Sequence, residues 1–366
     1  MNLTRRTALT ALGGALASPV IRPAWAQSRT VNIYNWSDYI GETTLADFEA
    51  ATGITPVYDL YASAEEMQAK MLAGSTGYDV VIMSGMSLPR FIKAGVYQKL
   101  DRSKLTNWDN LDPDTLKIVQ GFDPNLEYVV PYMWGSVGMA YNMEMIKERL
   151  PNADLNDLGV LLNPETAAIL GECGISVLDS PTDFGYMVMR YLGIDTNTAG
   201  PAEYAKMVEA VKPIREYIST FDNSNFISAM PNGELCVANS WSGDYGVAMT
   251  RAKEAGIEID LKYFVPKTGA PAWFDNWAIP SDAPNVAEAH EFINFMLRPD
   301  VIAAATNYTG YANANKAALP FVDPSIANDP AIYPDAETMS RLYIPTTPTA
   351  EQDREIMRAW TEIKAG

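Results

Sequence analysis

The segment GYDVVIMSG at residues 77–85 constrains the fold more than any other stretch of the chain. Its four consecutive apolar residues, Val80 to Met83, predict a strand that is buried on both faces, as in sheets that helices cover on both sides. Comparable strand patterns occur at 31–36 and 174–179, among others, and helix patterns of moderate length separate them. This alternation predicts the α/β class, with a parallel or mixed sheet flanked by helices.

The order of the extended segments predicts two lobes. Further strands are expected at 55–62, 128–142, 235–241, 259–266 and 273–280. The segment 128–142 is expected to form two extended runs, broken at Pro131 and Gly135, where the chain leaves the first sheet. More than one crossing segment between two lobes would explain this order. The expected lobes are 27–134 with 258–306, and 135–257 with 307–366.

The first 26 residues have the composition of an export signal. An arginine pair at 5–6 precedes an apolar run at 8–20, and Ala24 and Ala26 fit a small-x-small cleavage site. The run is too short to span a bilayer of ~30 Å as a stable helix. We therefore expect the mature protein in a bacterial periplasm, exported by either the Sec or the twin-arginine route.

The chain has two cysteines, Cys173 and Cys236. A disulfide between them is the default expectation in an oxidising compartment, with two buried thiols as the alternative. On the chain-entropy model, a closed loop of this length contributes on the order of 4 kcal/mol to stability. The CxxC spacing of redox-active pairs is absent.

The charge balance excludes one class of partner. Removal of the leader deletes three arginines and no acids, so the formal charge falls from −18 to −21 over 340 residues. Such a chain repels nucleic acid and attracts cations, although solubility alone is an equally good explanation of the acidity.

Residues for catalysis are scarce. The single histidine, His290, lies in an Ala- and Phe-rich helix pattern, where a structural role is expected. No GxSxG, GxxxxGK[ST] or GxGxxG motif occurs, and one His with two Cys nearly excludes a zinc site. We therefore expect no metal and no cofactor. A glycosidase that uses paired carboxylates is a minor alternative, since acidic residues abound.

Aromatic residues lie beside carboxylates at three expected strand ends. The groups are Trp36 and Tyr39 with Asp38, Trp241 with Asp244, and Trp273 with Asp275. An indole face stabilises an ammonium by ~0.5–2 kcal/mol, and desolvating the ammonium requires a hydrogen-bonded anion. Core packing explains any one tryptophan, but it explains three such pairs less readily. The pattern suits an aliphatic di- or polyamine.

Several long segments point to a known family. In order, the chain contains IYNWSDYI, AGSTGYDVV, AGVYQKLDRSKL, VPYMWGSVGMAYN, CVANSWSGDYGVA, FDNWAIP, FMLRPDV and YANANKAA. With them it resembles the periplasmic putrescine- and spermidine-binding proteins of ABC polyamine importers, most closely the putrescine-binding branch. The resemblance covers essentially the whole mature chain.

The resemblance implies a fold and a function. Two α/β lobes close on a small cationic amine in the cleft between them, and the protein delivers the amine to an inner-membrane ABC permease without catalysis. A monomer is expected. Another amine, such as agmatine, cadaverine or spermidine, and a role as polyamine sensor are the alternatives.

The resemblance also implies roles for individual residues. The implied cleft contacts are Trp36, Ser37, Tyr39, Ser84, Trp241, Trp273 and Tyr311, with Asp38 close by. Asp244 and Asp275 share one ammonium, and Asp183 faces the other. Cys173 and Cys236 fall where the branch has its disulfide. The chain departs from the branch at Asp183 (usually Glu), at Trp273 (commonly Phe) and in SGMS at 84–87, which leaves the preferred amine length open.

Overall fold

The computed structural model describes residues 29–366. The expected export signal and its cleavage point therefore lie outside the described residues. Within the described part, no helix is long and apolar enough to cross a membrane.

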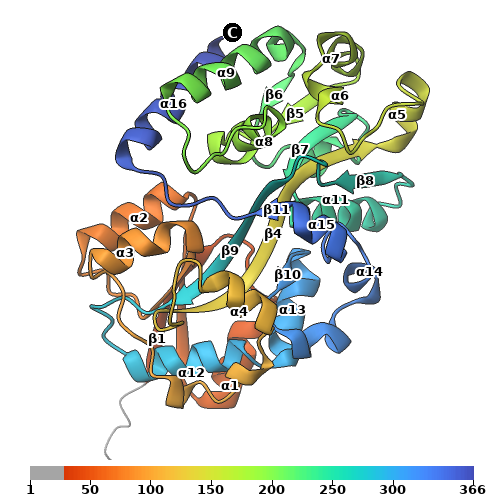
Figure 1. The fold of residues 1–366 in the computed structure, drawn as a ribbon. Coiled ribbons are helices and arrows are strands. Elements are labelled where there is room, and N and C mark those ends of the chain that lie inside the picture. Colours follow the sequence, from red (N-terminus) through yellow and green to blue (C-terminus); the bar gives the residue numbers. More distant parts are fainter. Residues whose placement is uncertain (1–28) are drawn as a thin grey trace, which may run out of the picture.

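The chain forms two lobes that two long strands connect, and helices pack on both faces of the mixed sheet in each lobe (Figure 1). The strand order is β2-β1-β3-β9-β4-β7-β5-β6. The first lobe contains parallel strands β1 (Thr30–Trp36), β2 (Thr55–Tyr61) and β3 (Val80–Ser84), with β9 (Ala270–Ala278) antiparallel to β3. This arrangement confirms the predicted α/β class.

The helices of the first lobe cover that sheet. They are α1 (Thr44–Thr52), α2 (Ala64–Ala73), α3 (Leu88–Lys93), α4 (Pro113–Val119), α12 (Val286–Met296), α13 (Pro299–Thr309), α14 (Pro324–Ala327) and α15 (Ala336–Arg341), with short strands β10 (Ala312–Asn313) and β11 (Leu342–Tyr343). Residues Val80–Met83 of β3 are fully buried, as the apolar run predicts. In the core, the Phe292 ring meets the rings of Phe48 and Trp277 edge-on.

The second lobe is built on β5 (Ile175–Val177), β6 (Thr220–Phe221), β7 (Val237–Trp241) and β8 (Leu261–Phe264). Its helices are α5 (Met143–Arg149), α6 (Gly159–Leu162), α7 (Pro164–Gly171), α8 (Tyr186–Tyr191), α9 (Pro201–Val211), α10 (Phe226–Ala229), α11 (Ser242–Glu254) and α16 (Ala350–Ala365). Helix α16 packs along α9 and inserts Trp360 beside the rings of Phe184 and Phe221.

Strand β4 (Val129–Asn142) passes from one lobe to the other as a single, wholly buried strand. Its first half pairs with β9, and its second half pairs with β7 and β8. The expectation of two separate runs was wrong. Pro131 is tolerated because the register with β9 shifts between Pro131 and Trp134, where a missing N–H costs little.

The hydrophobic clusters bear on the expected lobe boundaries in two places. Leu261 and Val265 pack beside second-lobe residues, whereas Ala314 and Ile332 pack in the first lobe. The segment 307–345 contacts both lobes, because Ala331 packs with Leu261 and Leu342 packs against the second-lobe cluster. The lobe boundaries therefore stay a prediction. The hydrophobic pattern predicts that these segments form helices and strands. Which lobe each segment joins depends on how it pairs with β4.

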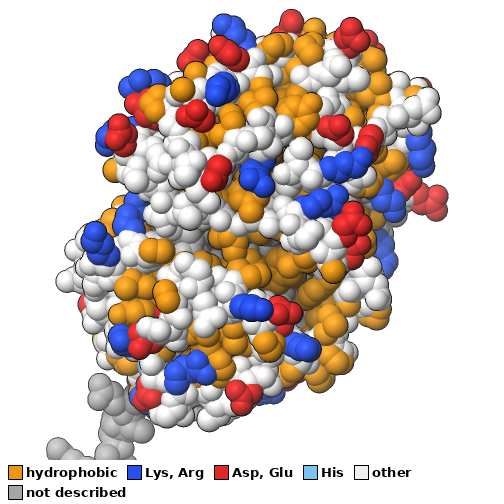
Figure 2. All heavy atoms as spheres, viewed as in Figure 1, with side chains coloured by type: hydrophobic (Ala, Val, Ile, Leu, Met, Phe, Trp, Pro, Cys, Tyr) orange, Lys and Arg blue, Asp and Glu red, His pale blue; other side chains and the backbone are white. Residues whose placement is uncertain are grey.

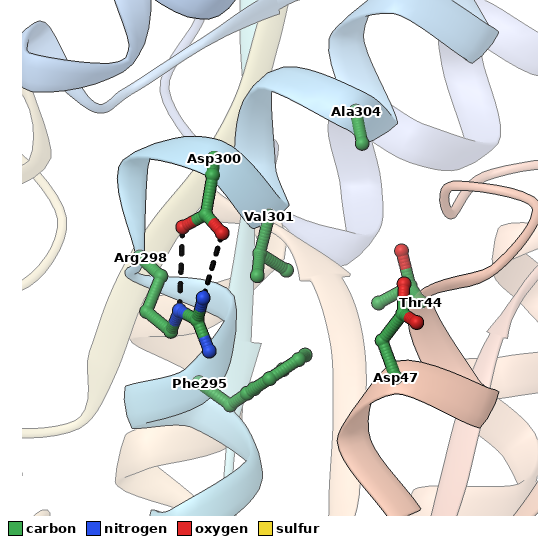
Figure 3. Close-up of a pocket in the computed structure, with 7 residues that line it drawn as sticks. All are labelled: Thr44, Asp47, Phe295, Arg298, Asp300, Val301 and Ala304. Atoms are coloured by element: carbon green, nitrogen blue, oxygen red, sulfur yellow. Dashed lines mark hydrogen bonds and ion pairs between the residues drawn. The ribbon is translucent and has the colours of Figure 1, made fainter. Parts of the chain in front are cut away.

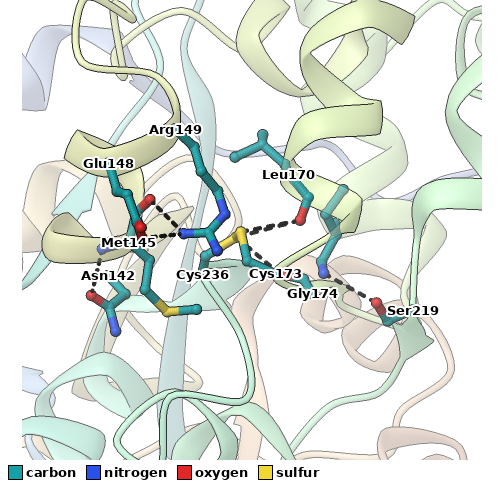
Figure 4. The surroundings of a disulfide bond; sticks show 10 residues. Asn142, Met145, Glu148, Arg149, Leu170, Cys173, Gly174, Ser219 and Cys236 are labelled. Carbon is teal, nitrogen blue, oxygen red and sulfur yellow. Dashed lines mark hydrogen bonds and ion pairs between the residues drawn. A yellow bond between two sulfur atoms is a disulfide. The ribbon is translucent and has the colours of Figure 1, made fainter.

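Cys173, which follows α7, and Cys236, which precedes β7, form a disulfide with Cα atoms 5.5 Å apart (Figure 4). The predicted pairing is confirmed. The bond ties α7 to the start of β7, so it stabilises the end of the second lobe that lies away from the exit of β7 at Trp241.

Candidate functional site

Strand pairing brings the predicted polar strand exits of the first lobe together. Ser84, the last residue of β3, lies directly opposite Asp275 of β9. Trp36 ends the parallel strand β1 beside them and packs at 4.4 Å, ring to ring, on Tyr61 at the end of β2. The carboxyl ends of parallel strands meet at one edge of a sheet, which is where open α/β sheets bind ligands.

The middle of β4 brings the remaining aromatic residues to the same place. Trp273 pairs with Gly135, and Trp241 pairs with Val137 two residues further along β4. Tyr311 immediately precedes β10, which also pairs with β4. The rings of Trp273 and Tyr311 meet edge-on, with centroids 5.0 Å apart.

Asp244 lies in the first turn of α11, just after the exit of β7. The Tyr311 hydroxyl donates a hydrogen bond to Asp244 Oδ1 at 2.5 Å. Burial raises the pKa of Asp244 to about 6, and the hydrogen bond from Tyr311 opposes that rise. This carboxylate therefore has a strong donor and is partly shielded from water.

Asp275 is only 8% exposed. Burial raises its pKa to about 7, and the nearby Tyr39 hydroxyl opposes the rise. The Tyr39 hydroxyl lies beside this carboxylate but makes no hydrogen bond of ordinary geometry to any described residue. The Tyr39 ring also meets the Tyr311 ring edge-on, with centroids 5.8 Å apart. Two tyrosines thus link the two aspartates.

Asp183 occupies the five-residue π-helical turn Pro181–Gly185 that precedes α8. Such turns are rare and often occur at functional sites. Burial raises the pKa of Asp183 to about 6, and hydrogen bonding from Ser180 and Trp241 opposes the rise. The charges of Asp183 and Asp244 both raise the pKa of Tyr263, so this tyrosine of β8 lies near both acids.

None of these three aspartates takes part in an ion pair among residues 29–366. The charge of Arg251 lowers the pKa of Asp244, but its effect is smaller than that of burial and that of the hydrogen bond from Tyr311. Buried carboxylates without a paired cation are expensive, and they become favourable when a cation joins them. The arrangement therefore suits a positively charged ligand held between aromatic walls.

Two of the predicted site residues lie apart from this buried group. Ser37 and Asp38 are exposed in the loop after β1, and Asp38 has a left-handed backbone with φ 52°. Sequence reasoning also missed Gly135 and Gly243, on whose backbones the rings of Trp273 and Tyr311 lie. The only signal for Gly135 is the run of small residues in GSVG within an otherwise bulky strand.

A surface pocket of the described part lies elsewhere. A cavity of about 260 Å³ opens beside α1 and α13, where the guanidinium of Arg298 pairs with both carboxylate oxygens of Asp300 (Figure 3). It contains none of the aspartates of the buried group, and the ion pair that lines it, between Arg298 and Asp300, is exposed. We therefore place the functional site by its chemistry and not by surface shape.

Metal and histidine chemistry have no support at either place. No group of three or more His, Cys, Asp or Glu within the described chain could hold a metal ion. His290 is buried: its Nε2 accepts the backbone N–H of Asp101, and Nδ1–H donates to the Val286 carbonyl. This histidine has the predicted structural role.

Two α/β lobes with buried acidic and aromatic side chains where they meet define the class of periplasmic solute-binding proteins. The chain belongs to the bacterial extracellular solute-binding protein family, whose model matches residues 43–334. The protein is therefore a periplasmic substrate-binding protein and not an enzyme, and the glycosidase alternative is set aside.

Two periplasmic binding proteins with similar sequences support this family assignment. The putrescine-binding periplasmic protein PotF of Escherichia coli (strain K12) is 42% identical over 357 residues, which are 97% of this chain and 96% of PotF. SpuD, a putrescine-binding periplasmic protein of Pseudomonas aeruginosa (strain UCBPP-PA14), is 42% identical over the full length of both chains.

A solved structure supports the fold. A putative spermidine/putrescine ABC transporter protein from Listeria monocytogenes has 29% identity and a TM-score of 0.81, over 92% of this chain and 99% of the other. The predicted two-lobed fold and membership of this family are confirmed.

Proposed function

We propose that this protein captures a putrescine-like di- or polyamine in the periplasm and delivers it, as a monomer, to an inner-membrane ABC permease. The observation that carries the proposal is a set of three desolvated aspartates, of which Asp275 is buried and Asp183 and Asp244 are partly buried. None has a cationic partner among the described residues, and aromatic rings lie beside them. The names of the two 42%-identical relatives, both putrescine-binding proteins, support the same ligand class.

The geometry suggests how such a ligand is held. In this proposal, one ammonium is shared by Asp244 and Asp275. The proposal is supported by the hydrogen bond from Tyr311 to Asp244 and by the contact between the rings of Tyr311 and Tyr39. The second ammonium faces Asp183, near Trp241. We assign the contacts to Trp36, Tyr39, Ser84, Asp183, Trp241, Asp244, Trp273, Asp275 and Tyr311, with Ser37 and Asp38 at the exposed loop after β1.

Ligand binding and lobe closure are coupled in this proposal. Asp275 belongs to the sheet of the first lobe, whereas Asp183 and Asp244 belong to elements of the second. A diamine that contacts all three stabilises the arrangement in which the lobes are close together, by its differential affinity for that state.

Calorimetry with putrescine, cadaverine, agmatine and spermidine tests the proposal directly. We expect at least one of them to bind to the mature protein at micromolar or tighter affinity, roughly −8 kcal/mol or better. Asp244→Asn keeps the shape but removes one charge, and it should weaken binding by on the order of 2–4 kcal/mol.

Asp109→Asn is the matched control, because Asp109 is exposed and distant in the fold from this group, on the 3₁₀ turn Trp108–Asn110. It should leave affinity unchanged. No binding of any of the four amines would refute the function, and an Asp244→Asn affinity within threefold of wild type would refute the role of that residue.

A further inference from the structure

We propose that Gly135 and Gly243 are positioning residues of the amine site, whose missing side chains set where the rings of Trp273 and Tyr311 lie. The inference rests on the proposed function for its consequence, but its geometric part is independent of any ligand. Neither glycine contacts the amine in this proposal, since both act through the aromatic ring above them.

The closest approach occurs at Gly243, in the first turn of α11. A Cβ atom there would lie 2.2–2.3 Å from three atoms of the Tyr311 ring, whereas real Cβ atoms essentially never come within 3.0 Å of another atom. Tyr39 and Trp273 meet the ring edge-on and limit the directions in which it can move away. Its hydroxyl is held on Asp244.

Gly135 makes the corresponding close contact with the ring of Trp273. A Cβ atom on Gly135 would lie 2.6 Å from Cζ2 and 3.0 Å from Cε2 of the indole. Both atoms belong to the six-membered ring of the indole. We expect the smaller ring of phenylalanine at position 273 not to extend to this point. The same Cβ would lie 3.0 Å from Ser242 Oγ, which accepts the backbone N–H of Ser136.

Backbone conformation does not explain either glycine. Both have ordinary φ values, unlike Gly53, Gly174 and Gly310, which occupy the left-handed region. Glycine is less favourable than alanine inside a helix, and it weakens a strand interior. Close approach of an aromatic ring is therefore the physical reason for a glycine at both positions.

The two contacts have a common result. They let the edge-to-face pair of Trp273 and Tyr311 lie at the level of the backbone, where the Tyr311 hydroxyl reaches Asp244. A methyl group at either position pushes a ring toward the space in which the ligand is proposed to lie, and at 243 it also separates the hydroxyl from the carboxylate.

The Gly135 contact is tested by rescue. Gly135→Ala should weaken binding of the preferred amine by about tenfold or more, and adding Trp273→Phe should restore most of that loss, because the indole atoms that clash are gone. Trp273→Phe alone supplies the reference. A double variant that binds no better than Gly135→Ala, or a Gly135→Ala variant that binds like wild type, would overturn the proposal for this position.

The Gly243 contact is tested without ligand. Because the Tyr311 hydrogen bond lowers the pKa of Asp244, Gly243→Ala and Tyr311→Phe should both raise that pKa in the ligand-free protein, as measured by carboxyl ¹³C NMR. Gly200→Ala, at the N-terminus of α9 in the same lobe, is the control and should leave it unchanged, because the added methyl would meet only Glu203 Oε2, at 3.7 Å.

An unchanged Asp244 pKa in Gly243→Ala, with the shift present in Tyr311→Phe, overturns the positioning role whatever the ligand is. If the pKa shifts as expected but wild-type protein binds none of the four amines, the positioning holds and the proposed function fails. Should Gly243→Ala not fold, the Gly135→Ala and Trp273→Phe cycle still decides the matter, since it involves neither Gly243 nor Tyr311.

Discussion

Burial makes Asp183, Asp244 and Asp275 the side chains whose charge most affects ligand binding. Their pKa values are raised to about 6, 6 and 7 from the ordinary value of 3.8, chiefly because water is excluded from them. An ammonium favours the ionised form of each, so at neutral pH binding must be accompanied by the release of protons.

We therefore expect amine affinity to weaken as the pH falls through 7 and then 6, and to level off above about pH 8. Calorimetry in buffers of different ionisation enthalpy measures both the affinity and the protons released. Asp275→Asn should release fewer protons than wild type at pH 7. An affinity that does not change between about pH 8 and pH 5.5 would contradict the assignment of these carboxylates to the ligand.

The ligand-free protein should show the opposite trend in stability. A folded-state pKa above the unfolded one means that the folded state holds more protons, so the stabilisation is complete below pH 3.8 and is lost as the pH rises through 6 and 7. Urea unfolding at about pH 5.5 and pH 8 should show this decline, and Asp275→Asn should reduce it.

Asp183 offers a test of ligand length. If it faces the far ammonium, a C4 diamine held by Asp244 and Asp275 leaves a gap that water fills. Asp183→Glu should then favour putrescine over cadaverine or spermidine by about 1 kcal/mol, since a water-bridged contact is only slightly poorer than a direct one. Adding Trp273→Phe separates the effect of the wider aromatic wall. Unchanged relative affinities in both variants would place length selection elsewhere, for example in residues 84–87.

At this scale the sequence predicts candidate acidic and aromatic residues, whose roles in binding stay a prediction, but it does not predict how they are arranged. Polar residues at expected strand ends predict Asp244, which follows the exit of β7, whereas Asp275 lies inside β9 and comes to the sheet edge by pairing with Ser84, the last residue of β3. Apart from the small residues of GSVG, no pattern indicated that Gly135 and Gly243 lie beneath aromatic rings, since residue spacing along one strand says nothing about a ring contributed by another. The exposure of Asp38 follows from the left-handed turn, which no pattern indicated.

At the scale of elements, α16 is the segment whose packing is most easily tested. Thr349 and Gln352 form a capping box at its N-terminus, and Trp360 is 1% exposed. The Trp360 indole N–H donates to Asp179 Oδ1 at 2.7 Å, and Lys364 Nζ lies 2.9 Å from the same oxygen. The helix therefore contributes both apolar and polar contacts to the second lobe.

Trp360→Ala should lower the free energy of unfolding by about 3–5 kcal/mol, because it removes a large buried side chain and leaves Asp179 with one donor fewer. Met357→Ala in the same helix is the control, since Met357 is 52% exposed, and it should change stability by less than about 0.5 kcal/mol. Urea denaturation measures both. Equal stability of the two variants would mean that α16 does not stabilise the lobe as its burial indicates.

The positions of the strands could be predicted from the sequence, but the strands with which they pair could not. The strands at 55–61, 80–84 and 237–241 lie within the segments that hydrophobic patterning predicted. Strands β8 and β9 follow each other within a few residues, yet β8 pairs in the second lobe and β9 begins the return to the first. Periodicity cannot distinguish these cases, because the choice of sheet depends on contacts far away in the sequence.

At the scale of the molecule, the two lobes carry different parts of the proposed site. Acidic and basic side chains are interspersed on the face seen in Figure 2, and the molecule narrows between the lobes. The lobes are connected through β4 and β9. The register of β4 with β9 shifts between Pro131 and Trp134, and strands bend at such irregularities.

We expect the preferred amine to reduce the radius of gyration of the protein in solution, because one ligand contacts both lobes and favours their closed arrangement. Small-angle X-ray scattering with and without the amine measures this change. Asp244→Asn at a ligand concentration that leaves it unbound should scatter like ligand-free wild type. Identical scattering of bound and free wild-type protein would exclude closure as the response to binding.

The insertion of the second lobe between β3 and β9 has a consequence for the order in which the chain acquires structure. Because β9 lies between β3 and β4 in the sheet of the first lobe, strands β1 to β3 keep an unpaired edge until residue 278 has been made. Contacts so distant in sequence close late. The amino-terminal third of a nascent chain therefore cannot complete the fold of the first lobe by itself. It stays incompletely folded until most of the polypeptide has been synthesised.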